Sequence, residues 1–165
     1  MNNNNTDTDW IAIRQKKDEL LNQVSDEYKR DCLNKSGIYS ISIEGQLVYI
    51  GESKSILDRW IAHKINTLYD FNQKDYKEGK YRVLREAYNA GLSIQCNMLE
   101  ECVDNKDTRL QIEKQWIKKE KPMLNGGKHN EVYKNGHALI EQIIKEREKN
   151  VCSKSKNNTD RKNNC

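Results

Sequence analysis

Two tyrosines on either side of a short turn are the first residues whose type and spacing could support chemistry. Residues 36–51 are rich in β-branched and aromatic residues, which predicts a β-hairpin with a three-residue turn at 44–46. The cross-strand pairs of that hairpin would be Ile43 with Leu47, Ile41 with Tyr49, and Tyr39 with Gly51. Tyr39 and Tyr49 then lie on one sheet face as diagonal neighbours, and Gly51 leaves space beside the Tyr39 ring for a ligand or a backbone. For tyrosines taken alone, ordinary strand formation is the better interpretation.

An arginine and a histidine lie four residues apart on the helix predicted over residues 53–68. Arg59 and His63 are therefore neighbours on one helix face. The apolar stripe of this helix is Leu57, Ile61, Ile65 and Leu68. Arg59 and His63 lie roughly opposite that stripe, with Trp60 between them and the core, so both are available to a ligand. For such a pair taken alone, a solvated helix face is the better interpretation.

A glutamate falls inside the apolar face of the helix predicted over residues 107–120. The apolar residues of that face are Leu110, Ile112, Trp116 and Ile117, and Glu113 lies between the last two. An ionised carboxylate in such a place needs a partner, because burying an unpaired charge is costly. A divalent cation is one such partner, since Mg²⁺ is commonly held by one or two carboxylates. A buried Lys or Arg is an equally good partner on this evidence.

Eight elements must position these side chains. Helical spacing of apolar residues predicts helices over 10–34, 53–68, 81–90, 107–120 and 136–150, and strand patterns predict the hairpin over 36–51 and a third strand over 92–102. This order predicts an α/β (α+β) fold, in which helices flank a small, mostly antiparallel three-stranded sheet. The first and last helices are additions at the two ends of that layer.

Composition narrows the class of protein. The chain has 165 residues, of which 35% are hydrophobic and 33% charged, which favours one compact domain with a modest core. No apolar run approaches the roughly 18 to 20 residues of a membrane span, and the Asn-rich start lacks the apolar stretch of a signal peptide. We therefore expect an intracellular protein with no membrane partner.

Cysteine spacing argues against a zinc site and a disulfide framework, and net charge does not identify a partner. The five cysteines include no CxxC pair, so neither a zinc site nor a disulfide framework is predicted. Lys and Arg number 29 against 25 Asp and Glu, a formal net charge of +4. This charge permits a polyanionic partner without arguing for one.

Two triplets flank the predicted turn, Gly37-Ile38-Tyr39 and, after nine intervening residues, Tyr49-Ile50-Gly51. They are followed by Arg59, His63, Glu113 and the segment Lys121-Pro122-Met123-Leu124-Asn125. This set closely resembles the GIY-YIG nuclease superfamily over roughly residues 36–130. The stretch from Gly51 to His63 is most similar to the phage homing endonucleases of that family, and the chain length suits its compact restriction-like or phage-encoded members.

The resemblance implies roles for the residues of the hairpin and the next helix. Tyr39 would act as general base on the attacking water or pass its proton to His63. Tyr49 would orient groups and hydrogen-bond within the site. Arg59 would hold the non-bridging oxygens of the scissile phosphate, for which its planar fork is well suited.

The resemblance also implies a metal site and several supporting residues. Glu113 would bind one divalent ion per active site, Mg²⁺ or Mn²⁺, and Asn125 would position the substrate or the other side chains. Gly51 would keep the pocket open. Lys54 matches a lysine of the homing members and is a possible substrate-binding residue, whereas other members place their lysine directly after the second triplet, where this chain has Glu52.

The implied activity is metal-dependent hydrolysis of DNA that leaves 5′-phosphate and 3′-hydroxyl ends. We expect double-stranded DNA as the substrate, in the cytoplasm of a bacterial or phage-infected cell. Specific recognition usually buries at least about 1,000 Å² of protein, so we also expect a homodimer during cleavage. Two alternatives stay open at this point: a non-catalytic nucleic-acid-binding module that retains the fold, and an interaction protein built on the terminal helices.

The predicted organisation has five parts. A disordered tail covers residues 1–9 and a helical arm covers 10–35. The catalytic domain covers 36–130. A helix over 131–150 and a disordered basic tail over 151–165 follow it.

Overall fold

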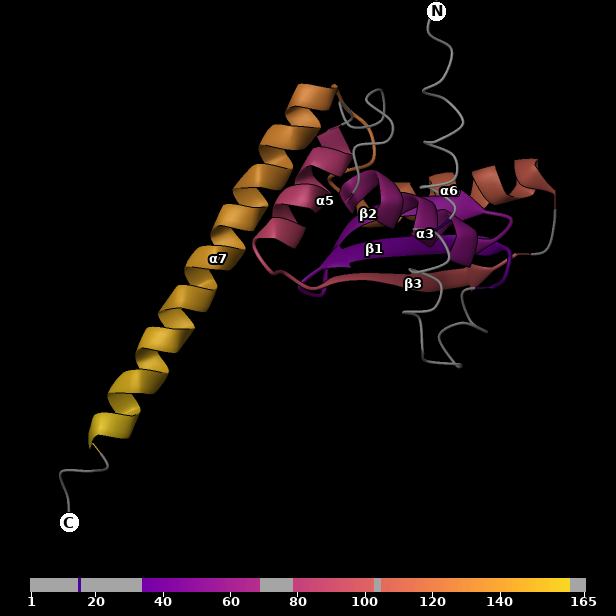
Figure 1. Ribbon diagram of the computed structural model, residues 1–165. Coiled ribbons are helices and arrows are strands. Elements are labelled where there is room, and N and C mark those ends of the chain that lie inside the picture. Colours follow the sequence, from indigo (N-terminus) through magenta and orange to yellow (C-terminus); the bar gives the residue numbers. More distant parts are fainter. Residues whose placement is uncertain (1–14, 16–33, 69–78, 103–104, 161–165) are drawn as a thin grey trace, which may run out of the picture.

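A computed structural model describes residues 15, 34–68, 79–102 and 105–160 (Figure 1). The predicted tail over 1–9 lies outside the described residues, as does nearly all of the predicted helix over 10–34. Among the described helices, none is both long and apolar enough to cross a membrane.

The sheet has three antiparallel strands, β1 (Gly37–Ile43), β2 (Gln46–Ser53) and β3 (Ile94–Glu101), in the order β2-β1-β3. Every residue of the central strand β1 is buried. With the helices on both sides, this architecture confirms the predicted α+β fold with a three-stranded antiparallel sheet. Because β1 is the middle strand, Tyr39 lies in the most enclosed part of the sheet.

The hairpin turn is shorter than predicted, but the predicted pairing of Tyr39 with Gly51 is correct. Only Glu44 and Gly45 form the turn, both at positive φ (51° and 80°) as a type I′ turn requires. Ile43 therefore pairs with Gln46, and the predicted pair of Ile43 with Leu47 is wrong. A bulge between Ile41 and Ser42 then restores the other two predicted pairs, Ile41 with Tyr49 and Tyr39 with Gly51.

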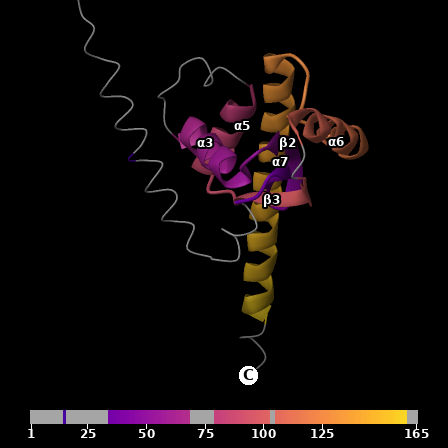
Figure 2. The same ribbon diagram turned by 90° about the vertical axis from the view of Figure 1, so that its right-hand side faces the viewer.

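Helices cover both faces of the sheet. They are α3 (Ile56–Leu68), α5 (Gly79–Asn89), α6 (Lys106–Glu120) and α7 (His129–Asp160). Figure 2 shows α3 and α6 on opposite sides of the strands. The main core lies on the α3 side, where Tyr39, Ile41 and Ile43 of β1 pack with α3, α5 and α7. Ser55 begins α3 as an N-cap, because its Oγ accepts a hydrogen bond of 3.3 Å from the Asp58 N–H.

The last helix is longer than predicted. We expected it to end at residue 150 and a disordered tail to follow, but α7 continues to Asp160. No Gly or Pro occurs between residue 137 and residue 160 to end it. Leu139, Ile140 and Ile143 of this helix are buried, and Ile144 packs against the core. The helix lies along α5 (Figure 1), and it approaches so closely that a Cβ at Gly136 would overlap the Val83 side chain.

Truncating the centre of this helix contact should destabilise the whole domain. Ile140 is 1% exposed, so Ile140→Ala should lower the free energy of unfolding by about 2–5 kcal/mol through lost burial and a new cavity. Urea unfolding followed by circular dichroism measures this loss. The exposed Glu148→Ala on the same helix should unfold like the wild type, and equal midpoints for all three proteins would contradict the packing described.

Candidate active site

A buried histidine bonded to two tyrosines forms the centre of the site. The His63 Nε2 atom lies 2.7 Å from the Tyr39 hydroxyl, and the His63 Nδ1 atom lies 3.1 Å from the Tyr81 hydroxyl. Tyr39 comes from β1, His63 from α3 and Tyr81 from α5. All three are at most 4% exposed. Three separate elements must therefore pack correctly before this hydrogen-bonded chain exists.

The position of His63 corrects the sequence-based prediction. Arg59 is exposed, as expected, but His63 is buried although it lies on the side of α3 opposite the predicted stripe. Tyr39 of β1 and Tyr81 of α5 bond its two ring nitrogens, and the centroid of the Tyr49 ring of β2 lies 5.6 Å from that of His63, so the sheet and α5 together enclose it. His63 is therefore enclosed by protein and meets a ligand only through its tyrosine partners.

Burial determines the protonation states of His63 and Tyr39. Desolvation, with smaller contributions from the positive charges of Lys80 and Arg59, holds the pKa of His63 well below its usual range. Burial also raises the pKa of the Tyr39 phenol far above its usual value, helped by Tyr49 and opposed by Arg59. At neutral pH the imidazole and the phenol are both uncharged. A neutral imidazole has one nitrogen free to accept a proton, which suits a relay from Tyr39.

Tyr49 completes the aromatic cluster beside a positive charge. Its ring centroid lies 6.2 Å from that of Tyr39 and 5.6 Å from that of His63. Tyr49 is half-buried, and burial raises the pKa of its phenol while Arg59 opposes the rise. The exposed guanidinium of Arg59 thus acts on both hairpin phenols from the solvent side.

Glu113 lies within electrostatic reach of this cluster. It is half-buried, like the apolar residues around it on α6, so the predicted apolar face is only partly covered. Burial and the nearby charge of Glu52 raise the pKa of Glu113, while a backbone hydrogen bond from Glu52 and the charge of Arg59 oppose the rise. Glu113 in turn raises the pKa of Tyr49. A carboxylate with these surroundings would be stabilised by a bound cation.

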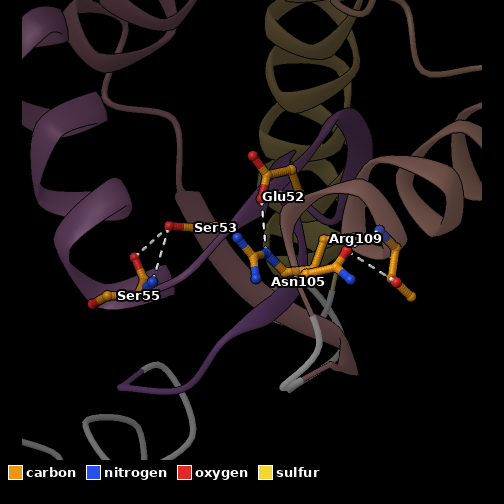
Figure 3. Close-up of polar contacts among 6 residues, drawn as sticks. Glu52, Ser53, Ser55, Asn105 and Arg109 are labelled. Carbon is orange, nitrogen blue, oxygen red and sulfur yellow. Dashed lines mark hydrogen bonds and ion pairs between the residues drawn. The ribbon is translucent and has the colours of Figure 1, made fainter.

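Glu52 stands where other members place a lysine, and it has a partner on α6. Its carboxylate accepts a hydrogen bond of 2.9 Å from the Arg109 guanidinium, as Figure 3 shows. Arg109 is the buried charged residue of α6. This ion pair ties the end of β2 to the helix that carries Glu113, and so it fixes how far Glu113 lies from the hairpin.

Asn125 bonds the backbone of the second triplet. Its Oδ1 accepts from the Ile50 N–H at 2.7 Å, and its Nδ2 donates to the Ile50 carbonyl at 2.6 Å. Next to it, the Leu124 N–H donates to the Val48 carbonyl at 2.9 Å. Since β2 is an edge strand, these contacts continue the sheet by one short segment. Asn125 thereby holds the backbone that carries Tyr49 and Gly51.

The two possible substrate-binding residues lie in different surroundings. A Cβ at Gly51 would overlap the Tyr39 phenol, so the space that we predicted beside Tyr39 is occupied by the tyrosine ring itself. Lys54 is exposed in the short connection between β2 and α3. The Ser53 and Ser55 contacts in Figure 3 fix that connection, with the Ser55 N–H donating to Ser53 Oγ at 3.1 Å.

Two residues of the cluster were not found from the sequence. Tyr81 bonds His63, and Lys80 lies over the rings of Tyr49 and Tyr81 at 4.9 Å from each centroid. Both stand at the start of α5, where the polar composition of residues 70–80 predicts a connection and a helix is predicted only from residue 81. Their place depends on how α5 packs on α3, which local patterns do not encode.

Comparison with known proteins agrees with this geometry. Residues 35–128, more than half of the chain, match the family model of the GIY-YIG catalytic domain. The chain belongs to the GIY-YIG family. It is also 31% identical over 128 residues to intron-associated endonuclease 1 of Enterobacteria phage T4. That alignment covers 73% of this chain and 49% of the phage protein, so the chain spans about half the length of the relative that it matches. No solved structure matches the chain.

GIY-YIG nucleases typically use a divalent metal ion, and the residues present fit such an ion. Among the described residues, no group of three or more His, Cys, Asp or Glu could hold a metal by itself. Glu113 offers a carboxylate whose charge is disfavoured by burial and by Glu52. Mg²⁺ is commonly bound by one or two carboxylates, with water and phosphate as the remaining ligands. Glu113 can therefore supply a carboxylate ligand for such an ion.

Replacing His63 should remove a pH dependence of stability. Because the pKa of folded His63 is depressed, the unfolded chain binds a proton below about pH 6.5 that the folded chain does not bind. Wild-type stability should therefore fall below that pH by up to about 1.4 kcal/mol per pH unit more than the stability of His63→Gln. Urea unfolding between pH 5 and pH 7.5 measures the difference. Parallel curves for wild type and His63→Gln would refute a buried neutral imidazole.

Changing Asn125 to aspartate should release the edge of β2. The aspartate keeps an acceptor for the Ile50 N–H but cannot donate to the Ile50 carbonyl, so Asn125→Asp should cost about 1–3 kcal/mol of stability. Thermal unfolding at pH 7 measures the cost. Asn97→Asp, an exposed change on β3, is the matched control. Equal unfolding temperatures would show that the Asn125 side chain does not hold this strand.

Proposed function

We propose that the chain is a metal-dependent DNA endonuclease, of the restriction-like or phage and mobile-element kind. It hydrolyses phosphodiester bonds to 5′-phosphate and 3′-hydroxyl ends. The observation that carries the proposal is the 2.7 Å contact between Tyr39 and a buried, neutral His63, next to Tyr49, Arg59 and Glu113. A phenol and an imidazole in contact form a proton relay that can activate a water. A guanidinium can stabilise charge on the phosphoryl oxygens, and a carboxylate can hold a metal ion.

Tyr39 takes the proton of the attacking water. As the water loses a proton to the Tyr39 oxygen, the phenol proton passes to His63 Nε2, so the phenol need not ionise despite its raised pKa. Tyr39 has no exposed surface, whereas Tyr49 is half-buried. The water therefore approaches past Tyr49, which orients it. The new hydroxide attacks phosphorus, and the bond from phosphorus to the 3′ oxygen breaks.

Arg59, Glu113 and the supporting residues act on the phosphate. The exposed Arg59 guanidinium binds the non-bridging oxygens, where its fork matches a pair of acceptors. Glu113 would hold one Mg²⁺ or Mn²⁺ ion, which would stabilise negative charge on the leaving 3′ oxygen. Asn125 keeps the second triplet in place and Gly51 leaves room for the Tyr39 ring. Lys54, exposed next to them, contacts the DNA backbone.

Double-stranded DNA is the substrate in this proposal. The family match gives a nuclease domain, and the T4 relative is named an intron-associated endonuclease. Double-strand cleavage requires two cuts, for which a homodimer is the simplest assembly.

Removing the Glu113 carboxylate should abolish cleavage. A bound ion contributes several kcal/mol to catalysis, so Glu113→Ala should cut supercoiled plasmid at least about a hundredfold more slowly than the wild type in Mg²⁺ or Mn²⁺. Chelator should stop the wild type. Glu120→Gln, an exposed change on the same helix, should cut normally.

The products and the inactive outcome are equally informative. End mapping should find 5′-phosphate and 3′-hydroxyl termini, and a 3′-phosphate would contradict the mechanism. Wild-type protein that binds plasmid but nicks it in neither metal would instead identify a binding module that retains the fold.

A further inference from the structure

A hollow in the protein surface adjoins the tyrosine–histidine cluster on the side of Tyr49. It has a volume of about 300 Å³ and is lined by Tyr49, Lys80, Asn125, the apolar side chains of Leu124 and Val132, and the backbone of residues 126–127. This volume is at the small end of the range for ligand cavities, which suits a single nucleotide unit. Tyr49 and Asn125, two residues of the proposed catalytic centre, therefore also line this hollow.

Lys80 links the hollow to the reactive side chains. Its Nζ lies 4.9 Å from the centroid of the Tyr49 ring, and its positive charge contributes to the lowered pKa of His63. Lys80 is half-buried at the first turn of α5, so two aromatic rings limit where its ammonium can lie. Among the described residues that line the hollow, Lys80 is the charged one.

The shape of the hollow fits a sugar with its phosphate. Leu124 and Val132 offer apolar contact on one side. Gly126, at φ 93°, has open space where a Cβ would stand, so a ligand can approach the backbone closely. The Lys128 N–H, at the amino end of α7, donates to the Glu131 carboxylate at 3.4 Å. Lys80 carries the charge among the described residues that line the hollow, so its ammonium would bind an anion there.

We propose that this hollow binds the sugar-phosphate unit next to the scissile phosphate, with Lys80 Nζ contacting its phosphate. The proposal rests on the proposed nuclease function and adds a second phosphate contact to the one assigned to Arg59. Lys80 is a positioning residue: it places the strand so that the neighbouring phosphate reaches Arg59 and Tyr39. A lysine suits this task because a point charge accepts a phosphate in several orientations.

The salt dependence of DNA binding tests the subsite without requiring cleavage. We would measure affinity for a fluorescently labelled random-sequence DNA duplex in chelator, between about 50 and 200 mM salt. Lys80→Met should reduce the slope of log affinity against log salt by about 1, the loss of one phosphate contact. Lys80→Arg should restore the slope. Lys64→Met is the matched control, because Lys64 also lies over an aromatic ring, at 5.4 Å from the centroid of Trp60, but lines a different hollow.

Each outcome of this experiment decides the question. A reduced slope for Lys80→Met alone, rescued by arginine, supports the subsite. An unchanged slope, an equal reduction for Lys64→Met, or no duplex binding by the wild type overturns it. Plasmid cleavage by the wild type is measured separately. If DNA binding shows the expected slopes but no cleavage occurs, the nuclease proposal is contradicted. If cleavage occurs but the slope for Lys80→Met is unchanged, only the subsite is contradicted.

Discussion

The need to satisfy both nitrogens of one buried imidazole governs the centre of this domain. His63 is excluded from water, so each of its nitrogens requires a partner within the protein. Tyr39 and Tyr81 provide those partners from two other elements. A hydroxyl can donate or accept, so the chain of bonds persists whichever nitrogen carries the proton. The same property that makes the cluster stable also makes it able to move a proton.

The edge strand β2 joins the two faces of the sheet at the site. Tyr49 turns toward the aromatic cluster, whereas Glu52 turns toward α6 and pairs with Arg109. Glu113 and Tyr49 affect each other across this edge, although their elements approach the sheet from different sides. The site therefore combines groups from both faces of the sheet at the edge strand β2, with Tyr39 contributed by the neighbouring central strand β1.

Most elements, and the pairing of Tyr39 with Gly51, could be predicted from the sequence, because the spacing of apolar residues and the two triplets are local signals. Tyr39 opposite Gly51 is correct even though the turn is shorter than expected, since a bulge compensates. The burial of His63 could not be predicted from its own helix, because residues of β1, β2 and α5 enclose it. Likewise, the influence of Glu52 on Glu113 depends on how α6 packs against β2. The end of α7 was misplaced because polar composition was taken to indicate disorder.

The short segment that follows α6 has an effect beyond the site. By bonding the Val48 carbonyl and both backbone groups of Ile50, Leu124 and Asn125 occupy outer hydrogen-bonding groups in the middle of β2. An unpaired strand edge is a template on which another chain can add, and aggregation often begins there. This segment removes that hazard from the strand that carries Tyr49. The opposite edge belongs to β3, where the exposed charges of Glu100 and Glu101 discourage intermolecular strand addition.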